Sequence, residues 1–105
     1  MPNRNEKVAN FIKELSAEFL GREANHTSLI TVTNATCSPD LKRATIFITV
    51  LPDDKEATAL HFVERQLGGI RGYLKSHMET KNIPFLHVEI DRGEKHRQRI
   101  DELLR

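Results

Sequence analysis

Residues 68–91, GGIRGYLKSHMETKNIPFLHVEID, decide the fold. The stretch opens on two adjacent glycines, at a point where a helical pattern would otherwise run on. The residues after the glycines keep helical register as far as Met78, and residues 82–84 end that pattern. Apolar and polar residues then alternate over 85–91, which predicts a strand. The stretch therefore predicts a glycine joint, a helix and a strand, in that order.

Two strands and a helix are predicted before this stretch. Residues 28–37 are rich in β-branched types and residues 44–51 alternate in the same way, so they predict an antiparallel hairpin across a turn containing Ser-Pro-Asp. A helix then begins near Asp53, where Asp53 and Glu56 resemble a capping box, and it runs to the glycines. One face of the second strand is predicted to carry Ala44, Ile46, Ile48 and Val50.

Amphipathic segments are predicted at both ends of the chain. Residues 4–20 have apolar side chains at helical spacing and are followed by Gly21, a residue typical of helix ends. The apolar stripe of this helix consists of Val8, Phe11, Ile12, Leu15 and Phe19. Residues 94–105 are helical in type. The predicted order is α-β-β-α-(glycine kink)-α-β with a short C-terminal helix, which indicates an α+β two-layer domain.

Composition limits the class of protein. The 105 residues fit one domain, residues 1–105, and the formal net charge of +1 neither supports nor excludes nucleic-acid binding. Cys37 is the only cysteine, which excludes an internal disulfide and favours a reducing compartment. No apolar run approaches the ~20 residues that span a bilayer, and the N-terminus lacks the apolar stretch of a secretion signal. We therefore expect a cytoplasmic protein that does not bind membranes.

The predicted order, with a glycine joint between two helices, is that of a bacterial-type (type II) KH-like domain. The chain also resembles the ribosome-binding factor A family in three stretches: residues 32–51 (VTNATCSPDLKRATIFITVL), residues 68–91, and residues 99–104 (RIDELL). Ile70-Arg71, Pro84 and Asp91 sit in the family's relative positions. The family's Ala-x-Gly joint falls on Gln66-Leu67-Gly68, where Gly68 matches and Gln66 departs from the usual alanine.

The resemblance implies a protein that is not an enzyme. It would bind immature small (30S) ribosomal subunits and aid late maturation and processing of their ribosomal RNA. Such a factor shifts the population of RNA conformations by binding one of them better than another. The resemblance implies no cofactor, no metal and no small-molecule substrate. The expected partners are the small subunit and its RNA, and we expect a monomer.

Basic residues and glycines around the joint are the candidate RNA contacts. Glycines let a phosphate approach the backbone closely, and two basic residues one helical turn apart can bind neighbouring phosphates. Each basic residue could equally belong to an ordinary solvated surface, and the glycines to a simple helix connector. The candidates are Lys42, Arg43, Arg65, Gly68, Gly69, Arg71, Lys75 and Lys81.

Other interpretations stay open. A KH-like RNA chaperone acting off the ribosome predicts salt-sensitive binding to many RNAs. A small metal-dependent hydrolase would need His87, Glu89 and Asp91 to meet at one ion, although they are spaced ~6–7 Å apart along one strand. A protein–protein adaptor would use the sheet edge. Most aromatic side chains fall on predicted core stripes, so base stacking is not expected.

Overall fold

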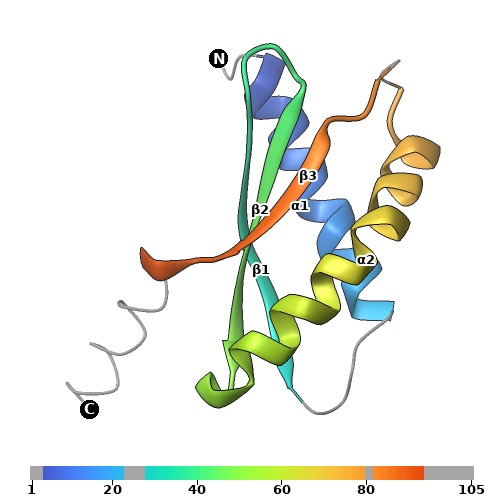
Figure 1. Cartoon of the computed structure of the whole chain (residues 1–105). Coiled ribbons are helices and arrows are strands. Elements are labelled where there is room, and N and C mark those ends of the chain that lie inside the picture. Colours follow the sequence, from blue (N-terminus) through green and yellow to red (C-terminus); the bar gives the residue numbers. More distant parts are fainter. Residues whose placement is uncertain (1–3, 23–27, 80–81, 94–105) are drawn as a thin grey trace.

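The computed structural model describes residues 4–22, 28–79 and 82–93. Its elements follow the order α1 (Arg4–Arg22), β1 (Leu29–Cys37), β2 (Arg43–Leu51), the short 3-10 helix η1 (Asp53–Lys55), α2 (Glu56–His77) and β3 (Phe85–Ile90). The α+β class is confirmed, with the order α-β-β-α-β (Figure 1). The helix predicted at residues 94–105 lies outside the described residues.

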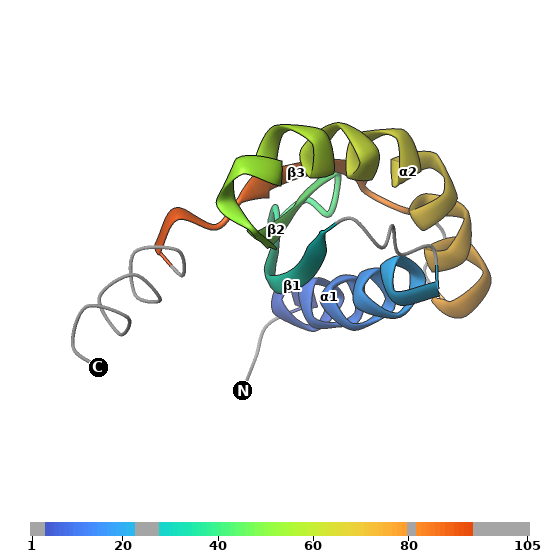
Figure 2. The same ribbon diagram turned by 90° about the horizontal axis from the view of Figure 1, so that it is seen from below.

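The three strands form one mixed sheet in the order β1-β2-β3. The predicted hairpin is confirmed, since β1 and β2 are antiparallel, whereas β3 pairs with β2 in parallel. A parallel neighbour requires the chain to cross back over the sheet, and α2 provides this crossover. Helix α1 packs mainly on β1 and α2 on β3, so both helices cover the same face of the sheet (Figures 1 and 2).

The core lies between the sheet and the two helices. The predicted apolar face of β2 is confirmed, because Ala44, Ile46, Ile48 and Val50 are all buried. Ile12 of α1 and Ile70 of α2, both fully buried, face it from the helical layer. A bulge in β1 between Val32 and Asn34 shifts its alternation by one residue. As a result Ala35 and Cys37 also turn toward the core.

The predicted break at the glycine pair is wrong. Helix α2 runs without interruption from Glu56 to His77, and none of the described glycines has a positive φ. Glycine in a helix costs about 1 kcal/mol relative to alanine, which is too little to end a helix whose flanking turns are buried. Val63 and Ile70, on either side of the pair, are both fully buried, so packing overrides local propensity.

Gly69 has a packing role instead. A Cβ at Gly69 would lie 2.7 Å from Cζ of Phe19, on α1, whereas one at Gly68 would meet nothing within 4 Å. The missing side chain at Gly69 therefore lets the two helices approach each other. Gly68 leaves bare backbone at the surface.

Alanine substitutions are expected to separate these two glycines. Gly68→Ala should raise the free energy of unfolding by roughly 0.5–1 kcal/mol, because it removes backbone freedom without a clash. The free energy of unfolding of Gly69→Ala should be lower than that of Gly68→Ala by about 1 kcal/mol or more, because Phe19 must shift. Urea unfolding of both variants measures the difference. Equal gains at the two positions would contradict the close contact.

The predicted stripe of α1 is largely confirmed. Val8 and Ile12 are buried and Leu15 and Phe19 pack against the core, whereas Phe11 is 52% exposed. The helix ends at Arg22, one residue after Gly21. Asp53 is not the N-cap of α2, since that position is Lys55, which makes no side-chain capping bond. Asp53 belongs to η1 instead.

Candidate nucleic-acid interface

The turn between β1 and β2 fixes the backbone of two candidate basic residues, Lys42 and Arg43. The Ser38 N–H donates to the Arg43 carbonyl at 2.8 Å, and Ser38 Oγ accepts from the N–H groups of Lys42 and Arg43 at 3.2 and 3.1 Å. Leu41 takes a left-handed conformation with φ of 62°, which reverses the chain. The backbone at Lys42 and Arg43 is thus set by the Ser-Pro-Asp-Leu sequence before it.

Asp40 is the acidic residue of this turn. Its carboxylate accepts hydrogen bonds from the Ser38 hydroxyl at 2.5 Å and from the Lys42 N–H at 3.1 Å. These bonds, that from Ser38 first, lower the pKa of Asp40 below its ordinary value. A carboxyl whose pKa is lower in the folded chain stabilises the fold above its unfolded pKa. That stabilisation is lost as the pH falls through the folded pKa.

Ser38→Ala is expected to raise the pKa of Asp40 back toward the value of an unfolded chain. The substitution removes the hydroxyl donor and also the acceptor for two backbone N–H groups. An NMR titration of the Asp40 carboxyl in the wild type and the variant measures this shift. An unchanged titration curve would show that Ser38 does not hold the carboxylate.

The start of β3 is attached to this turn and to α2. The Phe85 N–H donates to the Lys42 carbonyl at 2.9 Å. On the other side, Arg71 of α2 donates from Nη2 to the Ile83 carbonyl at 2.9 Å and from Nε to the Pro84 carbonyl at 3.5 Å. Two of the five guanidinium N–H groups make these bonds. Three segments that are distant in sequence therefore meet at one corner of the molecule.

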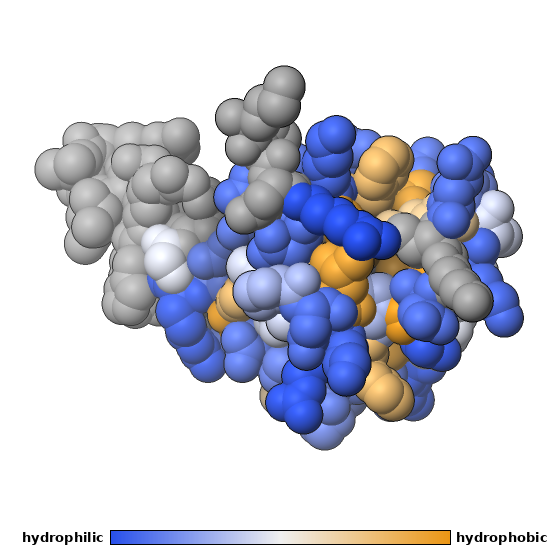
Figure 3. All heavy atoms as spheres, turned by 90° about the horizontal axis from the view of Figure 1, so that it is seen from above, coloured by the Kyte–Doolittle hydropathy of each residue, from blue (hydrophilic) through white to orange (hydrophobic). Residues whose placement is uncertain are grey.

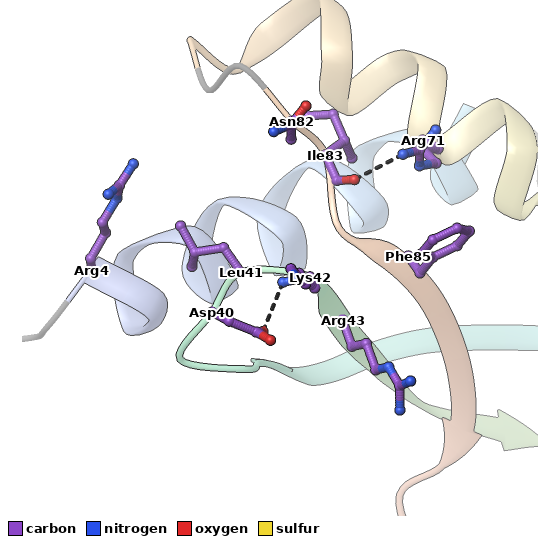
Figure 4. Close-up of a pocket in the computed structure, with 9 residues that line it drawn as sticks. All are labelled: Arg4, Asp40, Leu41, Lys42, Arg43, Arg71, Asn82, Ile83 and Phe85. Atoms are coloured by element: carbon purple, nitrogen blue, oxygen red, sulfur yellow. Dashed lines mark hydrogen bonds between the residues drawn. The ribbon is translucent and has the colours of Figure 1, made fainter.

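A cavity of about 630 Å³ opens at this corner. In Figure 4 Arg4 lies on the far side of the cavity from Arg71 and Phe85, with the turn below. Viewed from above, this end of the molecule shows hydrophobic surface surrounded by hydrophilic side chains (Figure 3). The lining residues are Arg4, Asp40, Leu41, Lys42, Arg43, Arg71, Asn82, Ile83 and Phe85. Four basic residues and one acidic residue make the lining strongly positive, although the whole chain has a formal net charge of only +1.

A second cavity of about 390 Å³ adjoins the first and shares Arg71, Asn82 and Ile83 with it. Its remaining lining residues are Gly68, Gly72 and Lys75, all from α2. A Cβ at Gly68 or Gly72 would meet nothing within 4 Å, so bare helix backbone lies beside the basic residues Arg71 and Lys75. Together the cavities form a positive surface along one side of α2 and around the β1–β2 turn.

A family model described as ribosome-binding factor A matches residues 4–104. The chain belongs to the ribosome-binding factor A family. Its relatives include ribosome-binding factor A of Thermomicrobium roseum, which is 32% identical over 100% of this chain and 84% of its own length. Ribosome-binding factor A of Geobacter sulfurreducens is also 32% identical, over 100% of this chain and 92% of its own length.

Solved structures of the family share the fold. The crystal structure of ribosome-binding factor A from Thermus thermophilus has a TM-score of 0.75 at 17% identity, covering 86% of this chain and 99% of that one. A homology model of the Thermus thermophilus factor, fitted into a cryo-electron microscopy map of a 30S complex, has a TM-score of 0.66 at 18% identity. It covers 78% of this chain and 89% of that one.

The sequence candidates divide into three groups in this family member. Lys42, Arg43 and Arg71 come together at the first cavity, and Gly68 and Lys75 join Arg71 at the second. Arg65 is exposed on α2 but lines neither cavity, and Gly69 faces Phe19. Lys81 lies outside the described residues.

Sequence reasoning missed Arg4, Asn82 and Phe85. Arg4 is distant in sequence from the glycine stretch, and only the packing of α1 on β1 brings it to the cavity. Phe85 is 75% exposed and lies on the outer side of β3, because the alternation over 85–91 turns Leu86, Val88 and Ile90 inward. Of the aromatic residues on the predicted core stripes, Phe11 is exposed.

The residues of the hydrolase interpretation do not converge. His87 Nε2 lies 3.4 Å from Glu89 Oε1 at the surface, whereas Asp91 accepts a hydrogen bond from the Thr33 hydroxyl at 2.6 Å. Within residues 4–22, 28–79 and 82–93, no three His, Cys, Asp or Glu side chains are grouped as metal ligands.

Cys37 is buried. Its burial and, to a smaller extent, the negative charge of Asp40 raise the pKa of its thiol. No described helix is long and apolar enough to cross a membrane.

Proposed function

We propose that this chain binds immature small ribosomal subunits and aids the late maturation and processing of their RNA without catalysis. Family membership supports this proposal, as does the cation-lined cavity at the corner where the turn, α2 and β3 meet. A homology model of a relative has been fitted into a map of a 30S complex. The protein acts in the cytoplasm as a monomer with one KH-like domain, residues 1–105.

Phosphate binding is the chemistry that the surface supports best. Arg4, Lys42, Arg43 and Arg71 line one cavity, where they can neutralise neighbouring phosphates and release their counterions. The guanidinium groups can also bind phosphate oxygens through two parallel hydrogen bonds. The binding energy then favours the RNA conformation that offers phosphates at this spacing, so no reacting group is required.

KH domains clamp nucleic-acid backbone at a glycine-rich loop, and this chain would do so in a modified form. Because α2 is continuous, no joint separates two helices, and phosphates approach the bare helix backbone at Gly68 and Gly72 instead. Arg71 and Lys75, one helical turn apart, flank that backbone. The RNA-binding residues we propose are therefore Lys42, Arg43, Gly68, Arg71 and Lys75, with Arg4 added from the structure.

Gradient sedimentation of cell lysate tests the proposal, with the protein followed by blotting across the fractions. We expect the protein to co-migrate with free small subunits and to be absent from translating ribosomes. A protein that stays at the top of the gradient at low salt would refute ribosome binding. Equal, salt-sensitive binding to many unrelated RNAs would instead support a chaperone that acts off the ribosome.

A further inference from the structure

Phe85 is an exposed aromatic side chain in a positively charged cavity. Its exposure of 75% is the highest among the large hydrophobic side chains of the described residues. Leaving a phenylalanine in water forgoes roughly 1.5–3 kcal/mol of burial energy. The core does not need this ring, because Leu86, Val88 and Ile90 form the inner side of β3. The position of Phe85 thus points to something outside the fold that covers it.

The ring is held in place before any ligand arrives. Phe85 is the first residue of β3, where its N–H bonds to the Lys42 carbonyl and its Cα pairs with that of Arg43. The Arg71 guanidinium carbon lies 5.6 Å from the centre of the ring, within cation–π range (Figure 4). A fixed aromatic side chain loses little conformational entropy on binding.

The surroundings of Phe85 select the chemistry of the ligand. An apolar protein surface would bury this ring next to Arg4, Lys42 and Arg43 and would leave their charges uncompensated. A nucleotide supplies both a flat aromatic base and an adjacent phosphate. The base must be unpaired, because a base inside a duplex already has both faces stacked. The cavity volume, about 630 Å³, lies in the range that accommodates small ligands.

We propose that Phe85 stacks on an unpaired base of the bound RNA while Arg4, Lys42 and Arg43 bind the flanking phosphates. This inference rests on the proposed function and adds to it a preference for single-stranded RNA at this corner. Stacking on an aromatic side chain tolerates all four bases, so the contact identifies an unpaired nucleotide and not a particular sequence.

Binding to short oligonucleotides tests the inference directly. The probes are a fluorescent single-stranded oligoadenylate, an abasic oligonucleotide of the same length and a duplex. Phe85→Ala is expected to weaken oligoadenylate binding about tenfold and to leave binding of the abasic probe unchanged. Phe85→Tyr should retain wild-type affinity, whereas Phe85→Leu, which keeps apolar bulk without a flat ring, should not. The wild type should bind the duplex more weakly than the single strand.

The control is Leu29→Ala, an apolar truncation at a residue that is 61% exposed at the opposite end of the sheet. Equal affinities of Phe85→Ala and the wild type for oligoadenylate would overturn the inference. The inference would also be overturned if Phe85→Ala bound subunits more weakly than the wild type but bound oligoadenylate equally well, because Phe85 would then contact a protein. Failure of the proposed function is a separate result, in which the wild type itself does not sediment with small subunits.

Discussion

Arg71→Glu is expected to weaken association with immature small subunits by at least about tenfold. Arg71 is the basic residue shared by both cavities, and a hydrogen bond to a charged group contributes roughly 1.5–3 kcal/mol. The glutamate also repels the phosphates that the remaining basic residues attract. Sedimentation of the purified variant with immature subunits, at several salt concentrations, measures the loss. The salt dependence should become shallower, because fewer counterions are released.

Arg71 also binds the carbonyl groups of Ile83 and Pro84, so its structural and RNA-binding roles must be separated. Arg71→Lys keeps the charge but cannot reproduce the two-point contact of the guanidinium. Lys55→Glu makes the same charge change in η1, beyond the far end of β2, and should leave association unchanged. Wild-type binding by a folded Arg71→Glu variant would remove Arg71 from the interface.

Ile70→Ala is expected to lower the free energy of unfolding by about 2–5 kcal/mol. Ile70 is fully buried, directly after the glycine pair, so its removal leaves a cavity between α2 and the sheet. A domain of this size has a total stability of roughly 5–15 kcal/mol, so the loss is a large share of it. Urea unfolding followed by circular dichroism provides the measurement.

Leu29→Ala is the matched control for Ile70→Ala. Leu29 is 61% exposed, and surface substitutions usually change stability by less than about 0.5 kcal/mol. Similar losses in the two variants would contradict the assignment of Ile70 to the core. A loss confined to Ile70→Ala would confirm that Ile70 packs in the core directly after the glycine pair.

The strands could be predicted from the sequence because the sheet has one buried face. The alternation in residues 44–51 correctly predicted the buried face of β2, because only one side of that strand contacts the helices. The glycine pair misled because its local signal is weak. A propensity cost of about 1 kcal/mol per glycine is smaller than the packing energy of neighbours such as Ile70 and Leu74.

The candidate site was predicted only in part. Lys42, Arg43 and Arg71 could be selected because they adjoin a recognisable turn and the glycine stretch. Arg4 and Phe85 could not, since their place at the cavity depends on how α1 packs on β1 and how β3 pairs with β2. Arg65 shows the opposite error, because sequence proximity to the glycines placed it in the group although it lines neither cavity.

The hydrogen bond from Phe85 to Lys42 joins the start of β3 to the turn before β2, and between them the chain passes through β2 and α2. Parallel pairing of this kind requires the chain to close a long loop first, which slows its formation. The cavity consequently needs the turn, α2 and β3 together, and no short peptide cut from the protein can reproduce it. Any RNA that binds there therefore stabilises the whole fold, by about 2.7 kcal/mol at a hundredfold excess over its dissociation constant.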